Sequence, residues 1–283
     1  MACVQDLTSQ YIFTGNNMPG PSVFLVMIWA YLANAASISK ELESPIYNNS
    51  KAEQGTYFEG DMILTTDQMD AIMFGSIRRN GIRDVTFRWP NATVVYHITE
   101  DHFNEKQVKM IEEAMNEISS ISCVKFRPQQ NNEHAVIIQR VRSGCSSCVG
   151  YRVKPVEGCT KQTLNLGNNC FQHGIIMHEL LHTIGFYHMQ NSYDRDDYVK
   201  IFLENVEKNQ EHNFLKYPKE IVTTFGVPYD YNSIMHYGEY YFSKNGKRTI
   251  IPLQENVTIG QRIHLSKGDI IKLNRMYNCV WYL

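Results

Sequence analysis

The segment HELLHTIGFYH, which ends at His188, constrains the fold more than any other part of the chain. His178 and His182 are four residues apart, so a helix places both imidazoles on one face, where they can bind one zinc ion. Glu179 lies one step around the helix and can reach a water at the metal without binding the metal itself. Gly185 tolerates left-handed backbone angles, so the helix can stop there and His188 can return as a third ligand.

Three protein ligands leave one coordination position open, which is the arrangement of a catalytic zinc site. Five fixed positions, three of them histidine, occur by chance in a chain of this composition less than about once in ten thousand sequences. A histidine pair alone would often be a buried structural feature. A structural zinc site is disfavoured because such sites normally close with four protein ligands.

The composition is that of an ordinary globular protein. Of the 283 residues, 43% are hydrophobic and 20% are charged, and the formal net charge is -2. This near-neutral balance argues against a general nucleic-acid binder, which would carry a basic excess. No apolar run reaches the roughly 18 residues of a membrane-spanning helix, so we expect no membrane span.

The N-terminal part resembles a secretory signal. The apolar run Val23–Leu32 has the length of a signal-peptide core, and the A-x-A pattern at 33–35 follows it, which predicts a signal region over residues 1–36. The alternative is a short buried helix. The stretch before the run lacks lysine and arginine, so we expect translation to start at Met18, which would also remove Cys3.

Removing Cys3 leaves six of the seven cysteines, an even number that predicts disulfides in a secreted chain. The number of cysteines does not determine which of them pair. Three glycosylation sequons are consistent with the same compartment, at Asn48, Asn91 and Asn256. We therefore expect a secreted, extracellular protein.

Strand and helix signals are mixed along the chain, and the polar stretch 37–54 is expected to be a flexible leader. Asn104 is predicted to cap one helix, and Ser266 with Asp269 forms a capping-box pattern before the last one. The expected elements are a strand over 92–99, a helix over 104–118, strands over 124–126 and 135–141, a glycine- and serine-rich loop over 145–159, an edge strand over 163–166, and helices over 171–184 and 267–277.

The histidine motif resembles that of the metzincin zinc endopeptidases. The pentapeptide SIMHY, which ends at Tyr237, resembles the Met-turn of the astacin family within that group. The likeness implies that Met235 lies beneath the zinc as an apolar cushion. It implies that Tyr237 binds zinc in the resting enzyme and later stabilises the oxyanion, while Glu179 serves as general base in the cleavage of polypeptide substrates.

The resemblance to astacins covers residues 80–283 and implies an α+β, zincin-like catalytic domain of two subdomains. A twisted, mostly parallel sheet and the active-site helix would lie above the cleft, and an irregular lower subdomain would end in a C-terminal helix. The family's two disulfides would be Cys123–Cys279 and Cys145–Cys170. Cys148 and Cys159 are additional to that pattern, and we predict that they pair with each other.

The leader also resembles that of astacins. Phe58-Glu59-Gly60-Asp61 is similar to the F-x-G-D motif of astacin propeptides, which implies that Asp61 binds the zinc and keeps the enzyme latent. Residues 37–79 would then be a propeptide. A trypsin-like protease would activate the zymogen by cutting after the dibasic pair that ends at Arg79, which leaves a peptidase domain over 80–283, expected to be a monomer.

Two other interpretations fit the sequence less well. A matrixin would carry a zinc-capping cysteine in its propeptide, and the leader from Ser37 to Arg79 has none. A catalytically inactive, secreted binding protein is disfavoured because Glu179 and Tyr237 are intact. The one feature that favours it is Met189. Most family members have a glutamate at this position, which contacts the N-terminal ammonium created when the propeptide is cut off.

Overall fold

The computed structural model describes residues 52–74, 85–152 and 162–280, all of which belong to one compact unit. Several sequence predictions lie outside the described residues. These are the signal region with Met18 and Cys3, the sequon at Asn48, the cleavage site at Arg79-Asn80, and Cys159, which we predicted to pair with Cys148.

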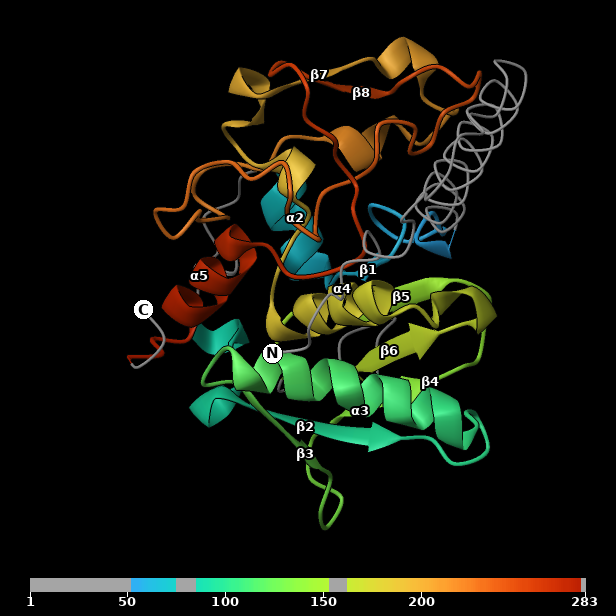
Figure 1. Cartoon of the computed structure of the whole chain (residues 1–283), viewed down its shortest axis with the longest axis vertical. Helices are drawn as coiled ribbons and strands as arrows, with labels where there is room; N and C mark the ends of the chain where they lie inside the picture. Colours follow the sequence, from blue (N-terminus) through green and yellow to red (C-terminus); the bar gives the residue numbers. More distant parts are fainter. Residues whose placement is uncertain (1–51, 75–84, 153–161, 281–283) are drawn as a thin grey trace, which may run out of the picture. The chain divides into compact units, whose positions relative to one another are not determined.

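A six-stranded sheet forms the part of the unit that corresponds to the predicted upper subdomain, and it lies in the lower half of the view in Figure 1. Its strands, in spatial order, are β1 (Met62–Ile63), β5 (Cys145–Cys148), β6 (Thr163–Leu166), β4 (Val136–Gln139), β2 (Thr93–Ile98) and β3 (Lys125–Pro128). All neighbouring strands pair in parallel except β5 and β6, which are antiparallel. The predicted mostly parallel sheet is confirmed.

Two details of this sheet differ from the sequence predictions. The stretch 145–148, expected to be loop, is strand β5, whose four small side chains are all buried. Strand β6, expected at an edge, is internal because β5 covers it. Beyond β5 the sheet is extended by β1, a strand contributed by the leader.

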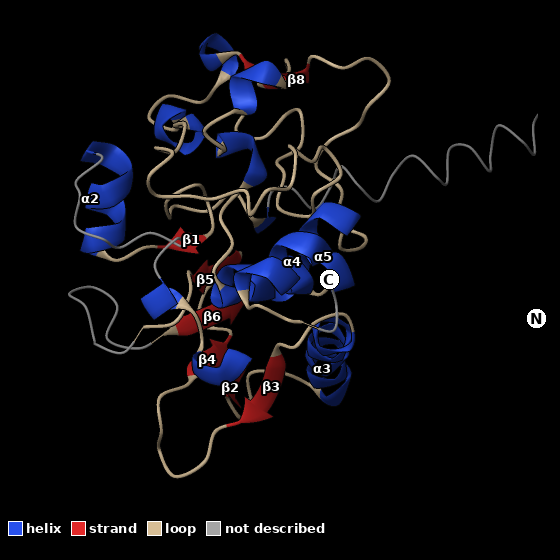
Figure 2. Cartoon of the chain, turned by 90° about the vertical axis from the view of Figure 1, so that its left-hand side faces the viewer, coloured by secondary structure: helices blue, strands red, loops and turns tan. Residues whose placement is uncertain are grey.

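Helices α3 (Glu105–Ser120) and α4 (His173–Ile184) pack against each other, and Figure 2 shows both along one face of the sheet. Asn104 caps α3 as predicted, because its side chain accepts a hydrogen bond from the Gln107 amide at 2.9 Å. Every residue of α4 after His173 is buried, as expected of a helix that is apolar on most sides. The α4 helix therefore forms the centre of the unit.

The chain after Gly185 is mostly irregular, as expected for the lower subdomain. It contains short 3₁₀ turns, a small antiparallel sheet of β7 (Val199–Ile201) and β8 (Ile250–Pro252), and the C-terminal helix α5 (Lys267–Met276). The capping box before α5 is present, since Ser266 accepts from the Asp269 amide at 2.9 Å. The leader adds helix α2 (Thr66–Phe74). Among the described helices, none has the length and apolar character needed to cross a membrane.

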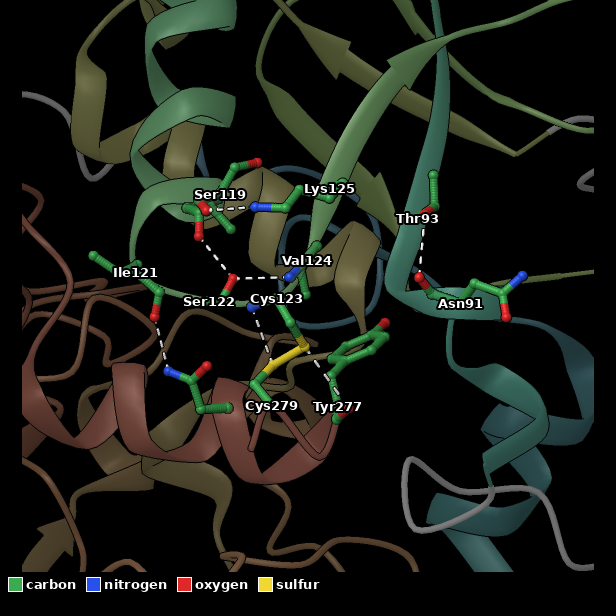
Figure 3. Close-up of a disulfide and its surroundings, with 12 residues drawn as sticks. Asn91, Thr93, Ser119, Ile121, Ser122, Cys123, Val124, Lys125, Tyr277 and Cys279 are labelled. Atoms are coloured by element: carbon green, nitrogen blue, oxygen red, sulfur yellow. Dashed lines mark hydrogen bonds between the residues drawn. A yellow bond between two sulfur atoms is a disulfide. The ribbon is translucent and has the colours of Figure 1, made fainter. Parts of the chain in front are cut away.

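The two disulfides implied by the family resemblance are present, Cys123–Cys279 and Cys145–Cys170. Figure 3 shows the first, which ties the chain just after α3 to the chain after α5. In the same region, Asn274 Nδ2 donates a hydrogen bond to the Ile121 carbonyl at 2.9 Å. The bond joins upper and lower parts of the unit that lie 156 residues apart in sequence.

Replacing both cysteines of Cys123–Cys279 with alanine should lower the free energy of unfolding more than the same change at Cys145–Cys170. Closing the longer loop restricts the unfolded chain more, and the chain-entropy model gives about 5 kcal/mol for the first pair and about 3.5 kcal/mol for the second. Denaturant titration of both double variants measures the difference. A larger loss from the Cys145–Cys170 variant would contradict this ranking.

Two predicted sequons lie on the surface of the described residues. Asn91, labelled in Figure 3, and Asn256 are both exposed. Both have positive φ angles, 53° and 58°, a conformation that asparagine tolerates better than most residues. Their side chains are therefore accessible to a glycosyltransferase.

Candidate active site

Three histidines converge at the C-terminal end of α4 and the turn beyond it. His178 Nε2 lies 3.1 Å from His182 Nε2 and 3.2 Å from His188 Nε2. Zinc–nitrogen bonds of about 2.0–2.1 Å in tetrahedral geometry would place such atoms about 3.3 Å apart. Buried nitrogen lone pairs that face one another at this distance fit a shared cation, and the spacing fits zinc.

Hydrogen bonds on the far side of each ring fix which nitrogen faces the centre. His178 Nδ1 donates to the Ile234 carbonyl and His182 Nδ1 to the Phe186 carbonyl, both at 2.8 Å. With Nδ1 protonated, the Nε2 lone pair is free to bind a metal. The ring orientation needed for a metal site is therefore built into the backbone around it.

Gly185 ends α4 as the sequence predicted. Its φ angle is 125°, and its amide donates to the carbonyls of Leu181 and His182 at 2.9 Å. This turn directs the chain back so that His188 reaches the other two histidines.

The turn that contains Met235 contacts the histidine site. Met235 is buried, its carbonyl accepts from the Met189 amide at 2.9 Å, and its neighbour Ile234 holds His178. Asp269 at the start of α5 fixes this turn, because it accepts from Ser233 Oγ at 2.6 Å and from the Ile234 amide at 2.9 Å. Sequence analysis found Asp269 as a helix cap but missed its role in holding the turn.

Asp269→Asn should weaken zinc binding by about 10- to 100-fold, the usual effect of losing a group that orients a ligand. An amide in this place cannot accept from both Ser233 and Ile234 with the same geometry, so His178 would lose its fixed orientation. Competition with a zinc-binding dye measures the affinity. Asp230→Asn is the matched control. Asp230 also accepts a hydrogen bond at the start of α5, from Ser266, but the Ile234 amide donates to Asp269 and not to Asp230. Equal losses in both variants would argue against the role of Asp269.

Glu179 is buried beside the histidines, and neither of its carboxylate oxygens has a hydrogen-bond partner among the described residues. Its oxygens lie near His178 and near Glu53 of the leader. Burial, and then the charges of Asp61 and Glu53, hold the pKa of Glu179 well above its ordinary value. Because both charges come from the leader, removing the leader should favour the ionised form of Glu179.

Asp61 faces the three histidines. Its Oδ2 lies 3.4 Å from His178 Nε2, and its Oδ1 lies 3.6 Å from His182 Nε2 and 3.4 Å from His188 Nε2. The carboxylate is fully buried, and no described residue donates a hydrogen bond to it. A buried carboxylate without hydrogen bonds is costly unless a cation sits beside it, so this donor set of three histidines and one aspartate fits a zinc ion.

The backbone of the leader lies along the sheet at this point. The Asp61 carbonyl accepts from the Ser147 amide at 2.9 Å, where β1 pairs with β5. Gly60 before it has a φ angle of 82°, and a Cβ there would collide with the Glu53 carbonyl. The glycine of the F-x-G-D motif is therefore required by a turn that folds the leader back on itself.

Glu59 is a second leader group in the site, and sequence analysis missed it. Its carboxylate bonds His188 Nδ1 at 2.8 Å and accepts from the Tyr217 hydroxyl at 2.6 Å. Its carbonyl accepts from the Tyr237 hydroxyl at 2.5 Å. In this structure Tyr237 is therefore bound to the leader. The signal that could have revealed Glu59 is its place inside the F-x-G-D motif.

Glu53 makes a third contact, and the prediction of a flexible leader up to residue 54 is wrong at this end. Glu53 is buried and pairs with Arg262 Nε at 2.8 Å, while the Tyr241 hydroxyl donates to it at 2.5 Å. Burial raises the pKa of Glu53, but the charge and the hydrogen bond of Arg262, together with the nearby His178, lower this pKa on balance. A lone acid in a polar stretch gives no sequence signal for such a contact.

Met189, the departure from the family pattern, is buried, and Lys272 Nζ donates to its sulfur at 3.0 Å. Its neighbour Gln190 accepts from the Tyr237 amide through its side-chain oxygen at 3.1 Å. The position usually held by glutamate is thus packed with an apolar side chain.

Comparison with known proteins agrees with this geometry. The family model described as Astacin, a family of peptidases, matches residues 81–278. The chain is 38% identical over 250 residues to zinc metalloproteinase nas-13 of Caenorhabditis elegans, an alignment that covers 85% of this chain and 54% of that protein. It is 39% identical over 206 residues to seminal metalloprotease 1 of Drosophila melanogaster, which covers 71% of this chain and 82% of that protein.

Among solved structures, high choriolytic enzyme 1, a hatching enzyme zinc-protease from Oryzias latipes (medaka fish), superposes with a TM-score of 0.62. The two are 34% identical, and the match covers 69% of this chain and 96% of that one. This chain spans about half the length of nas-13. The histidine centre, the fold above it and these matches together show that the chain belongs to the astacin family of peptidases.

Proposed function

We propose that the protein is a secreted zinc endopeptidase that hydrolyses peptide bonds of extracellular proteins and is made as a latent zymogen. The observation that carries the proposal is the convergence of three histidine Nε2 atoms and the Asp61 carboxylate beside the buried Glu179. His178, His182 and His188 would hold the zinc. When bound, zinc supplies a Lewis acid that polarises the scissile carbonyl.

The residues of the chain supply the rest of the chemistry. Glu179 takes a proton from the attacking water at its carboxylate and later delivers it to the leaving nitrogen. Once Glu59 has left with the leader, the Tyr237 hydroxyl is free to donate to the oxygen on which negative charge develops. Burial raises the pKa of Tyr237 well above its ordinary value, so the hydroxyl remains a donor at neutral pH.

Latency is explained by the leader, residues 37–79 in our assignment. Asp61, Glu59 and Glu53 each contact a different side of the site, so substrate cannot enter while the leader is docked. A trypsin-like protease that cuts after Arg79 would release it. Secretion is supported by the signal-like N-terminus, the two disulfides and the exposed sequons at Asn91 and Asn256.

The test is hydrolysis of a quenched peptide library by the full chain before and after cutting with trypsin. We expect hydrolysis only after the cut, its loss in a zinc chelator and its return when zinc is restored. A folded, zinc-loaded and correctly cut protein that cleaves no peptide would contradict the proposal and favour a binding protein on the same scaffold.

A further inference from the structure

The leader also contacts the peptidase part through Tyr57. The guanidinium of Arg142 lies over the Tyr57 ring, 4.9 Å from its centroid. Tyr57 belongs to the folded turn that precedes Asp61, since its carbonyl accepts from the Gly60 amide at 3.0 Å. An aromatic ring of the leader therefore rests on an arginine of the peptidase part.

Arg142 stands on the wall along which a peptide would lie. It precedes β5, the strand that pairs with the leader strand β1, and it lines a surface groove together with Ser143 and Gly144. When β1 leaves, the outer edge of β5 is open, and an extended peptide can pair with it as an added strand. The side chains of that peptide would then reach the groove.

Arg142 is available for such a contact. It is exposed, and among the described residues no carboxylate lies within ion-pair distance of it. The other arginine that lines the groove, Arg140, is differently engaged, because it donates to Asn168 Oδ1 at 2.9 Å and lies over the Phe103 ring. Loss of Tyr57 with the leader would leave the face of the Arg142 guanidinium open.

We propose, on the basis of the proposed function, that Arg142 forms a subsite that binds an aromatic side chain of the peptide substrate by stacking. The leader contacts two arginines of the peptidase part in different ways. It places the carboxylate of Glu53 on the buried Arg262 and an aromatic ring on the exposed Arg142. The difference has a physical reason. An exposed ion pair contributes little binding free energy, whereas the planar guanidinium stacks well on aromatic faces.

The test uses peptides of one sequence in which a single tyrosine is moved through the four positions on either side of the scissile bond. At each position, cyclohexylalanine provides a substrate of similar shape without a π face. The cut chain should show one position outside the scissile pair at which tyrosine raises kcat/KM about two- to fivefold over cyclohexylalanine, the range expected of an exposed cation–π contact. This ratio should fall to about one in Arg142→Gln and persist in Arg140→Gln.

Binding supplies a second readout that does not depend on catalysis. Calorimetry with the cut Glu179→Gln chain should show the same tyrosine preference in Kd, and its loss when Arg142→Gln is added. If the chain binds the tyrosine peptide more tightly but the wild-type chain hydrolyses no peptide, the aromatic subsite is supported and the proposed function is contradicted. Hydrolysis with equal ratios in wild type and Arg142→Gln, or an Arg142-dependent preference for glutamate over tyrosine, would overturn the aromatic subsite.

Discussion

Peptide hydrolysis by the cut chain is expected to fall about 10²- to 10⁴-fold in Glu179→Gln, the usual contribution of a positioned general base. Glutamine has nearly the same size and polarity but cannot take the proton of the attacking water. Glu179 is fully buried and neither of its oxygens is bonded to a described residue, so it is held for a small molecule rather than for a structural contact. The measurement is kcat/KM on a quenched peptide.

Two controls make this result specific. Zinc content, measured by mass spectrometry, should remain near one ion per chain in Glu179→Gln, because Glu179 is not a zinc ligand and His178 and His182 keep their hydrogen bonds to backbone carbonyls. Glu112→Gln, an exposed glutamate on α3, should retain full activity. A Glu179→Gln enzyme that keeps its zinc and more than a tenth of its activity would exclude Glu179 as the base.

The uncut chain should become active when Asp61 is replaced by alanine. Breaking a buried ion pair typically costs about 3–5 kcal/mol, so loss of the Asp61 carboxylate should shift the docking equilibrium of the leader by about two to four orders of magnitude. The assay uses a chain in which Arg78→Gln and Arg79→Gln prevent cutting. Hydrolysis should rise by about 10²- to 10⁴-fold over the same chain with Asp61 intact, up to the rate of the cut enzyme.

Asp67→Ala provides the matched control for this experiment, because Asp67 belongs to the same leader but is exposed on α2. The Asp67→Ala substitution should leave the uncut chain inactive in peptide hydrolysis. An uncut, folded and zinc-loaded Asp61→Ala chain that is equally silent would assign latency to the contacts of Glu59 and Glu53 instead.

The parts of the site that sequence could predict are those fixed by local spacing. The interval from His178 to His182 places two rings on one helix face whatever the rest of the chain does. Gly185 and His188 follow from the need to end that helix and return. The caps at Asn104 and Ser266 were predicted for the same reason, because a side chain there bonds an amide only three residues away.

The parts that sequence missed depend on partners far along the chain. Glu53 and Glu59 are ordinary acids in a polar leader until the fold brings Arg262, Tyr217 and His188 to them. Asp269 holds the Met-turn across 35 residues of sequence. No local pattern encodes such pairs.

Strand β5 illustrates a different limit. Its residues, Cys145 to Cys148, are small and buried on both faces, so they show no alternation of polar and apolar side chains. The glycines around it favour a loop by composition. The strand forms because β6 offers an edge to pair with, and the leader then pairs with β5 in turn.

The most direct test of this account is the location of zinc in the uncut chain. Crystals of the zinc-loaded chain, measured on both sides of the zinc absorption edge, would show the ion by anomalous scattering. We expect one ion per chain, bound by Nε2 of His178, His182 and His188 and by the Asp61 carboxylate. An ion held by other residues, or a histidine centre without zinc while Asp61 keeps its place, would contradict it.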